Sequence, residues 1–232
     1  MIRFLKRVGR FLLKLVLGFF ALSILSVFLF KFVAVPMTPL MLIRTFEQAT
    51  DEKQSIKLSK DWVPASEISK HAFQAVYAAE DQNFLNHHGF DWKAMEKAWE
   101  QNKKGRRIKG ASTISQQTAK NVFLWPARTY LRKGLEAYFT VLIELIWGKE
   151  RILEVYLNVI EMGPGIYGIE AAAQTYYGKT ASELNRAEAA MIAAILPNPR
   201  KWSPKKPTTY LKGRQSWILK QMGNLNQLPV GK

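Results

Sequence analysis

A run of 21 residues near the N-terminus, 15–35, constrains the chain most, because Lys31 is its only charged residue. About 20 apolar residues in a helix cross the hydrocarbon core of a bilayer, and a lysine near one end reaches the headgroups. Five basic residues and no acidic ones precede the run: Arg3, Lys6, Arg7, Arg10 and Lys14. Basic flanks favour the cytoplasmic side. We therefore predict a cytoplasmic basic tail (1–14), an uncleaved transmembrane anchor (15–35) and an extracytoplasmic, periplasmic remainder at the inner membrane. A cleaved signal peptide is the rival interpretation, but the run is long for one and no clear cleavage site follows it.

The rest of the chain is long enough for one sizeable domain and is itself basic. The formal net charge is +16 over 232 residues. Residues 1–35 hold six Lys or Arg and no acid, which leaves 28 basic residues against all 18 acidic ones. Nucleic acid, anionic lipid headgroups and phosphorylated substrates are therefore admissible partners. The absence of cysteine excludes disulfides, thiol catalysis and thiolate metal sites.

Helical patterns dominate the chain beyond the anchor, and no alternating strand pattern exceeds a few residues. Residues 36–61 are predicted to form a juxtamembrane segment, partly amphipathic, after the prolines that end the anchor. Caps, glycine stops and apolar periodicity predict helices at 64–82, from 113 onward, 129–147, 149–162, 167–177, 183–196 and 210–225. The sequence thus predicts one mainly α-helical domain over residues 62–232.

Two adjacent carboxylates, Glu80 and Asp81, fall at the end of the first of these helices. Acids at a helix C-terminus oppose the macrodipole, so this placement is unfavourable unless it serves a purpose. On propensity alone, such a pair is more often solvated surface than a catalytic pair. His87 and His88 lack a second cluster of histidines and carboxylates, so no metal site is predicted there. We expect His87 to order the following loop through a hydrogen bond.

A polar helix face follows, because Thr113, Gln116, Gln117 and Lys120 recur at helical spacing. It lies in an interval, residues 101–135, with nine Lys or Arg and no acid. Exposed helices usually mix both signs, so this interval predicts a field for anions. Several cations contribute to it: Arg106, Arg107, Lys109, Lys120, Arg128, Arg132 and Lys133. A lipid-linked pyrophosphate fits this field better than nucleic acid does, since the domain is predicted to lie outside the membrane.

Glu136 ends the acid-free interval and shares a helix face with Arg132, Thr140 and Glu144. An ordinary surface pair between Arg132 and Glu136 would contribute about 0.2–0.5 kcal/mol. A single carboxylate among cations, at the head of an otherwise apolar helix, indicates a more specific role.

Residues 149–179 carry two further patterns, whose physical content is mainly packing. Four apolar side chains form a predicted core face: Ile152, Leu153, Tyr156 and Val159. Glu154 and Asn158 are expected to be structural. The glycines within 163–168 lack a preceding strand and a following Lys-Ser/Thr, so they do not predict a nucleotide-binding loop.

Five motifs in order resemble the family 51 glycosyltransferases, which polymerise peptidoglycan strands from lipid-linked disaccharides. The motifs are Glu80-Asp81-x-x-Phe84-x-x-His87-x-Gly89, Gly110-Ala-Ser112-Thr113-Ile-Ser-Gln116-Gln117-Thr-Ala-Lys120-Asn121, Arg132-Lys133-x-x-Glu136, Lys149-x-x-Ile-Leu-Glu154-x-Tyr156-Leu-Asn158 and Gly163-x-Gly165-x-x-Gly168 with its continuation to Lys179. The resemblance covers residues 62–199. It implies a lysozyme-like, two-lobed helical fold, and the monofunctional members without a transpeptidase domain are the closest match.

The reaction implied is attack of the acceptor GlcNAc 4-hydroxyl on MurNAc C1 of a lipid-linked donor, with inversion and release of undecaprenyl pyrophosphate. The resemblance makes Glu80 and Glu136 the catalytic carboxylates, with Glu80 as general base. The expected substrate-binding residues are Asp81, Ser112, Gln116, Gln117, Lys120, Asn121, Arg128, Arg132 and Lys133. Glu136 either orients the cations or holds a divalent cation, Mg²⁺ or Mn²⁺, against the phosphates. No organic cofactor is expected.

Two other functions compete with this one. A lysozyme-like or lytic transglycosylase would cleave peptidoglycan with one protonated glutamate, but its chemistry gives no reason for the acid-free cationic interval. A non-catalytic membrane-anchored adaptor would leave the polar and acidic motifs unexplained. The expected partners are lipid II, the lipid-linked glycan chain and the membrane. Cell-division or cell-wall synthesis proteins are further candidates, and nucleic acid is not expected.

Overall fold

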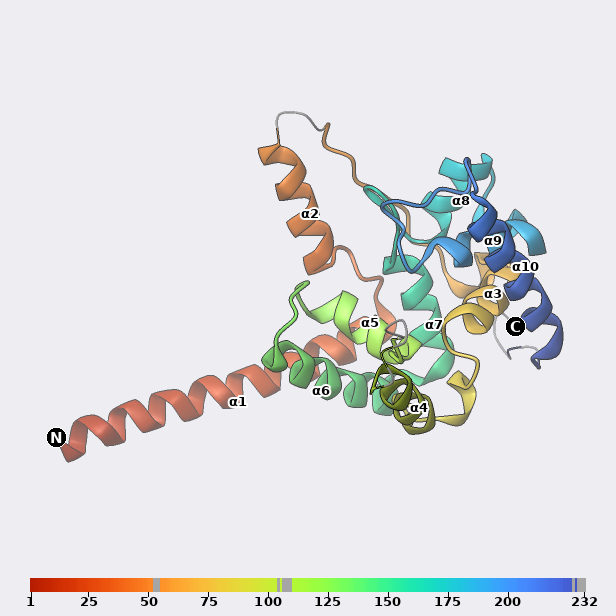
Figure 1. Ribbon diagram of the computed structural model, residues 1–232. Coiled ribbons are helices and arrows are strands. Elements are labelled where there is room, and N and C mark those ends of the chain that lie inside the picture. Colours follow the sequence, from red (N-terminus) through yellow and green to blue (C-terminus); the bar gives the residue numbers. More distant parts are fainter. Residues whose placement is uncertain (52–54, 104, 106–109, 227, 229–232) are drawn as a thin grey trace.

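A long helix, α1 (Ile2–Phe32), opens the chain, and its N-terminal half projects from the rest of the molecule (Figure 1). The structure is a computed structural model that describes residues 1–51, 55–103, 105, 110–226 and 228. Within α1, the stretch Arg3–Phe32 is long and apolar enough to cross a membrane. The helix is continuous from Ile2, so the basic tail is helical as well. The boundary between tail and span at residue 15 stays a prediction.

The C-terminal end of α1 is fastened to the domain by hydrogen bonds to its backbone carbonyls. The Trp147 indole Nε1 donates to the carbonyl oxygen of Val27 at 2.6 Å. The Arg151 Nη2 donates to the carbonyls of Phe30 and Val33 at 2.8 and 2.7 Å. The last carbonyls of a helix have no partner inside the helix. Trp147 and Arg151 supply partners for carbonyls near this end.

Two groups of packed helices make up the body of the domain (Figure 1). The first group contains α3 (Lys70–Glu80), α9 (Arg186–Ile195) and α10 (Thr209–Asn224). The second contains α5 (Ile114–Phe123), α6 (Tyr130–Ile146) and α7 (Gly148–Val159), with α1 packed on α6. The prediction of a mainly α-helical fold after one apolar N-terminal helix is confirmed.

The core face predicted on residues 149–162 is also confirmed. All four of its apolar side chains are buried: Ile152, Leu153, Tyr156 and Val159. The Asn158 amide pairs with both backbone groups of Val63 at 2.9 Å, and Glu154 forms an ion pair with Arg151 at 2.8 Å. Asn158 and Glu154 therefore have the structural roles expected of them.

A small sheet corrects two predicted helix ends. Its strands are β1 (Ser59–Lys60), β2 (Glu161–Gly163) and β3 (Ile166–Tyr167), in the order β1-β3-β2. The helix predicted over 149–162 ends at Val159, and the one predicted over 167–177, α8 (Ile169–Tyr177), begins two residues late. Gly168 lies between them at φ +84°, where an added Cβ would sit 2.7 Å from the carbonyl oxygen of Asn158. The glycines thus serve a tight hairpin.

Two further predicted helices are divided by local caps. The segment predicted as 64–82 contains a 3₁₀ turn (Ala65–Glu67) and then α3, which Ser69 caps by accepting a hydrogen bond from the backbone of His71. The segment predicted as 183–196 likewise splits. The Thr180–Glu183 capping box opens a 3₁₀ turn (Ala181–Glu183), and a second capping box, Asn185 with Glu188, opens α9.

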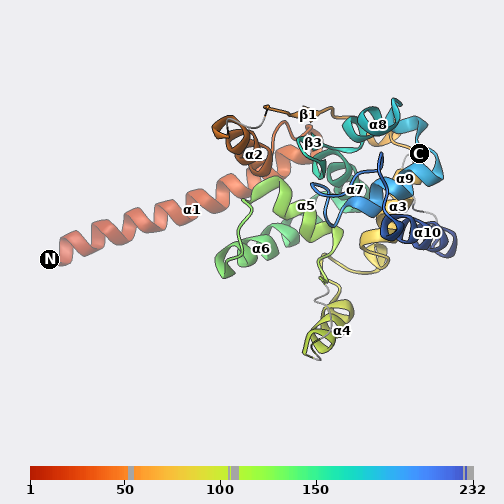
Figure 2. The ribbon, with the colours of Figure 1, turned by 45° about the horizontal axis from the view of Figure 1, so that its top comes forward.

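Two helices flank the body. The juxtamembrane segment contains α2 (Pro39–Thr50), capped by Thr38 and with proline in its first turn. The helix α4 (Trp92–Lys103), which the sequence did not predict, stands away from the body (Figure 2). Trp92 and Trp99 on α4 are exposed.

Candidate active site

Glu80, the last residue of α3, holds its carboxylate between side chains from two other helices. The Gln117 amide on α5 donates to Glu80 Oε2 at 3.1 Å, and Arg214 Nη2 on α10 lies 3.5 Å from Oε1. Burial raises the pKa of Glu80, while Gln117, Arg214 and more distantly Lys120 act against the rise. The carboxylate lines a cavity of about 320 Å³ together with Ser112, which we call the Glu80 cavity.

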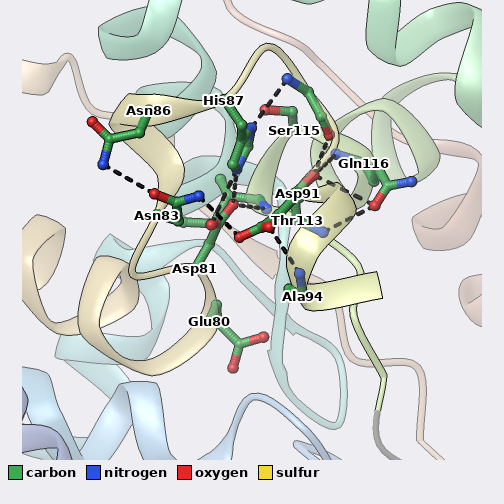
Figure 3. Close-up of polar contacts among 12 residues, drawn as sticks. Glu80, Asp81, Asn83, Asn86, His87, Asp91, Ala94, Thr113, Ser115 and Gln116 are labelled. Carbon is green, nitrogen blue, oxygen red and sulfur yellow. Dashed lines mark hydrogen bonds and ion pairs between the residues drawn. The ribbon is translucent and has the colours of Figure 1, made fainter. Parts of the chain in front are cut away.

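Asp81, the next residue in the chain, forms hydrogen bonds with α5 and with the loop that follows α3. Its Oδ2 accepts a hydrogen bond from the backbone N–H of Ile114 at 3.0 Å, at the N-terminus of α5. The His87 Nε2 lies 3.0 Å from the same oxygen, and His87 Nδ1 accepts from the backbone of Gly89 at 3.1 Å. Nδ1 is therefore the acceptor, so Nε2 carries the proton and donates to Asp81. Figure 3 shows Asp81 inside this hydrogen-bonded cluster and the Glu80 carboxylate outside it.

This arrangement explains why an acid at the end of α3 is tolerated. The Asp81 carboxylate opposes the dipole of α3 but lies at the positive end of α5, where a negative charge is favourable. The prediction that His87 orders the loop is confirmed. Asp81 also borders the Glu80 cavity, so the structure brings it to the site through a mainly structural set of bonds.

A second link ties the loop to the start of α5. The Thr113 hydroxyl donates to the carbonyl oxygen of Gly89 at 2.6 Å. Gly89 has φ +89°, and a Cβ there would lie 2.7 Å from Thr140 Cγ2 on α6. Both the backbone conformation and the close approach require glycine. The loop is therefore held against α5 and α6, close to the Glu80 cavity.

The predicted polar face of α5 divides into structural and site residues. Gln116 is buried, and its Oε1 accepts from the Thr113 backbone at 3.0 Å, so the predicted capping box is confirmed. Gln117 faces Glu80, and its Oε1 accepts a hydrogen bond from the Tyr156 hydroxyl at 3.3 Å. Because this oxygen is occupied as an acceptor, the amide nitrogen is oriented toward Glu80.

A larger cavity of about 520 Å³ lies at the other end of α5, and we call it the cationic cavity. Four of the predicted substrate-binding residues line it: Lys120, Asn121, Arg128 and Arg132. Burial lowers the pKa of Lys120, and the charge of Glu136 acts against that fall. From Thr113, at the Glu80 cavity, to Lys120 is seven residues, or about 10 Å of helix at 1.5 Å per residue.

Glu136 lies behind the cationic cavity, buried and paired with two cations. Arg132 Nη1 is 2.5 Å from its Oε2, and Lys133 Nζ contacts its Oε1. Lys133 also borders a smaller cavity of about 220 Å³ beside Gln116 and Trp99. Both carboxylate oxygens thus serve to hold cations. No group of three His, Cys, Asp or Glu side chains that could hold a metal ion occurs in the part of the chain that the structure describes.

Every predicted site residue from Glu80 to Glu136 therefore lies in or beside one of three neighbouring cavities that flank α5. The predicted cations at positions 106, 107 and 109 lie outside the described residues. Sequence reasoning missed Arg214 and Tyr156 as partners of the site. No sequence pattern near Arg214 marks it as a site residue, because it lies 134 residues from Glu80 along the chain, in the helix predicted at 210–225. Tyr156 was predicted only as core.

Comparison with known proteins decides the family. The family model described as "Transglycosylase" matches residues 47–223. The chain belongs to the transglycosylase family. A relative from Bdellovibrio bacteriovorus is 54% identical over 92% of this chain and 85% of its own length. Relatives from Chromohalobacter salexigens and Shewanella oneidensis are 51% and 48% identical, over 95% and 99% of this chain and 94% and 97% of their own lengths.

All three relatives carry the name "Biosynthetic peptidoglycan transglycosylase". This transglycosylase is therefore similar to them over most of its length. It is an enzyme of the glycosyltransferase class.

Proposed function

We propose that this transglycosylase polymerises lipid II into peptidoglycan glycan strands, with Glu80 as the general base. The observation that carries the proposal is the pairing of the two cavities along α5. One holds a carboxylate whose pKa burial raises, and the other gathers Lys120, Arg128 and Arg132. A base and an anion site at this separation suit a substrate that carries a sugar and a pyrophosphate.

The chemistry follows from the two reacting groups. A sugar hydroxyl is a weak nucleophile, and a positioned base accelerates its attack by about 10²–10⁴-fold. Glu80 takes the proton of the acceptor 4-hydroxyl as that oxygen attacks C1 of the donor sugar, with inversion. The departing pyrophosphate is already anionic and needs fixed positive charge rather than a proton. Lys120, Arg128 and Arg132 supply that charge, and Ser112 and Asn121 border the substrate.

Glu136 is assigned the role of orienting the cations. Its two oxygens hold Arg132 and Lys133, so it has no free pair of oxygens to offer a divalent cation. These residues do not fit a metal site built by the protein. A reaction that responds to Mg²⁺ or Mn²⁺ would receive the ion with the pyrophosphate of the substrate.

Cleavage of peptidoglycan is the competing reaction, because a glutamate of raised pKa also suits a general acid. The cationic cavity favours polymerisation, since an alkoxide leaving group needs a proton and no cluster of cations. Incubation of the full chain with labelled lipid II, followed by gel separation, tests the proposal. Growing polymer is the expected product. Release of muropeptides from preformed peptidoglycan, without polymer from lipid II, would replace this proposal with the hydrolase.

The base assignment predicts the pH dependence of the reaction. Burial raises the pKa of Glu80 above 4.5, its ordinary value, and a base must be deprotonated. Activity should therefore fall as the pH drops through a value above 4.5. Arg214→Gln removes a charge that lowers this pKa, so the acid limb of kcat/KM should move to higher pH. The profile is measured as initial polymerisation rate against pH. An acid limb that Arg214→Gln leaves in place would contradict the assignment.

The anchor is proposed to hold the N-terminus in the cytoplasm and the catalytic domain on the outer side of the inner membrane. The basic flank of residues 1–14 supports this orientation. Alkaline phosphatase fused after residue 232 should be active in intact cells, whereas a fusion at residue 14 should not. A domain that protease cannot reach in spheroplasts would reverse the topology. Contact with cell-division or other cell-wall proteins stays a prediction.

A further inference from the structure

The cationic cavity has a wall that none of the five sequence motifs supplies. Leu40 and Arg44, one turn apart on the juxtamembrane helix α2, line it together with Lys120, Arg128 and Arg132. Six residues separate α2 from the end of α1. The fourth basic side chain of the cavity therefore comes from the segment that joins the anchor to the domain.

The Arg44 guanidinium forms one ion pair and has one donor atom without a partner among the described residues. Its Nη1 forms an ion pair with Glu47 Oε2 at 2.6 Å, and the Arg44 side chain is 24% exposed. Its Nε is buried and has no hydrogen-bond partner among the described residues, and the same holds for the Nε of Arg132. A guanidinium carries five N–H donors, of which Glu47 occupies one. Two arginines with unsatisfied donors thus line one cavity.

The acidic residues around Arg44 raise the pKa of its guanidinium. Burial alone would lower its pKa, but the hydrogen bond to Glu47 and the charge of Glu161 outweigh burial and raise it. Glu161, the first residue of β2, is the acid of the cavity wall. Four cations and one carboxylate line the cavity, while Glu47 and Glu136 pair with Arg44 and Arg132 from outside the lining, so positive charge still exceeds negative charge around an anionic ligand.

We propose that Arg44 is a substrate-binding residue that holds the donor's pyrophosphate together with Lys120 and Arg128. The proposal rests on the proposed function, because that function places a pyrophosphate in the cationic cavity. Phosphate oxygens match the planar donor pattern of a guanidinium, which binds them in a bidentate manner. The juxtamembrane helix is thereby part of the donor site.

The simpler interpretation is that Arg44 only stabilises α2 through its ion pair with Glu47. An exposed pair of this kind is worth about 0.2–1 kcal/mol. Under this interpretation Glu47→Gln and Arg44→Gln have equal effects, because each removes the same pair. Under our proposal only Arg44→Gln weakens pyrophosphate binding, because Glu47→Gln leaves the cation in the cavity.

The test measures binding of farnesyl pyrophosphate and of inorganic pyrophosphate to the full chain in detergent micelles, by calorimetry. The variants are Arg44→Gln, Arg44→Lys, Glu47→Gln, Lys120→Ala and Arg200→Gln. Arg200 is the matched control: it also acts on the charge of Glu161, yet it lines a different cavity, of about 370 Å³, on the other side of Arg44. Melting temperatures are recorded for each variant.

We expect Arg44→Gln to raise the Kd for farnesyl pyrophosphate about tenfold or more, as for loss of a hydrogen bond between charged groups. Arg44→Lys should recover part of the affinity, and Arg200→Gln and Glu47→Gln should stay within about twofold of wild type. The KM for lipid II should follow the Kd, with kcat less affected. We expect Arg44→Gln to weaken the binding of inorganic pyrophosphate by the same factor, because Arg44 contacts the phosphates and not the lipid chain.

Four results would overturn the inference. If Lys120→Ala weakens binding and Arg44→Gln does not, the site stands without Arg44. If Arg200→Gln raises the Kd as much as Arg44→Gln does, the effect comes from the general electrostatic field. If Glu47→Gln does so, it comes from the stability of α2. If wild type binds neither pyrophosphate, the proposed function fails and the inference fails with it.

Discussion

Replacing Glu80 with glutamine should nearly abolish polymerisation while leaving the donor bound. Glutamine keeps the size of the side chain and an oxygen that accepts from Gln117, but it cannot take a proton from the acceptor hydroxyl. The rate should fall by about 10²–10⁴-fold, the usual contribution of a general base. The measurement is the initial rate of polymer formation from labelled lipid II, with the Kd for farnesyl pyrophosphate determined on the same preparation.

The control for this prediction is the Kd itself, which should stay close to that of wild type because the cationic cavity is unchanged. A Glu80→Gln variant that retained activity within tenfold would have lost less than about 1.4 kcal/mol of barrier stabilisation. That is too little for a general base. The role of Glu80 would then have to pass to another group.

Replacing Glu136 with glutamine should impair the enzyme severely, but through the donor rather than through the proton transfer. The variant breaks ion pairs of a buried carboxylate with Arg132 and Lys133. Removing one partner of a buried pair costs about 3–5 kcal/mol when the other charge stays buried. Arg132 should lose its fixed position, so the KM for lipid II and the Kd for farnesyl pyrophosphate should both rise, and the melting temperature should fall.

A matched variant separates the loss of donor binding from the loss of stability. Glu170 is also buried, and it accepts hydrogen bonds from the backbone of Ala181 and from Gln174, away from both cavities. Glu170→Gln should lower the melting temperature with little change in the Kd. If Glu136→Gln behaved in the same way, Glu136 would be a structural residue. A defect in Glu136→Gln that Mg²⁺ repaired would restore the metal alternative.

The helical architecture could be predicted because its signals are local. Thr113 with Gln116, Thr129 at the head of α6 and Gly178 after α8 each mark a helix end through bonds to near neighbours. The two divided helices were missed for a related reason. Ser69 and Asn185 are ordinary polar residues. Nothing nearby in the sequence shows that they cap a new helix and do not continue the preceding one.

The contacts that build the site could not be predicted from local patterns. Glu80 meets Arg214 across 134 residues, and Tyr156 meets Gln117 across 39. The unfavourable acid at the end of α3 was a usable clue, since it showed that Asp81 needed a partner. That the partner is the N-terminus of α5 depends on tertiary packing, as does the presence of Arg44 and Lys120 in one cavity.

The fastening of α1 uses backbone carbonyls, and this has an evolutionary and an engineering consequence. The bonds from Trp147 and Arg151 go to backbone carbonyls near the C-terminal end of α1, so they do not depend on which apolar side chains those residues carry. The part of α1 before Phe19, Phe20 and Ser23, which contact Tyr138, is therefore free to change in sequence or to be exchanged for another apolar helix. The spacing between Val27 and Phe30 is fixed, because one residue added between them would rotate one bonded carbonyl by about 100° relative to the other.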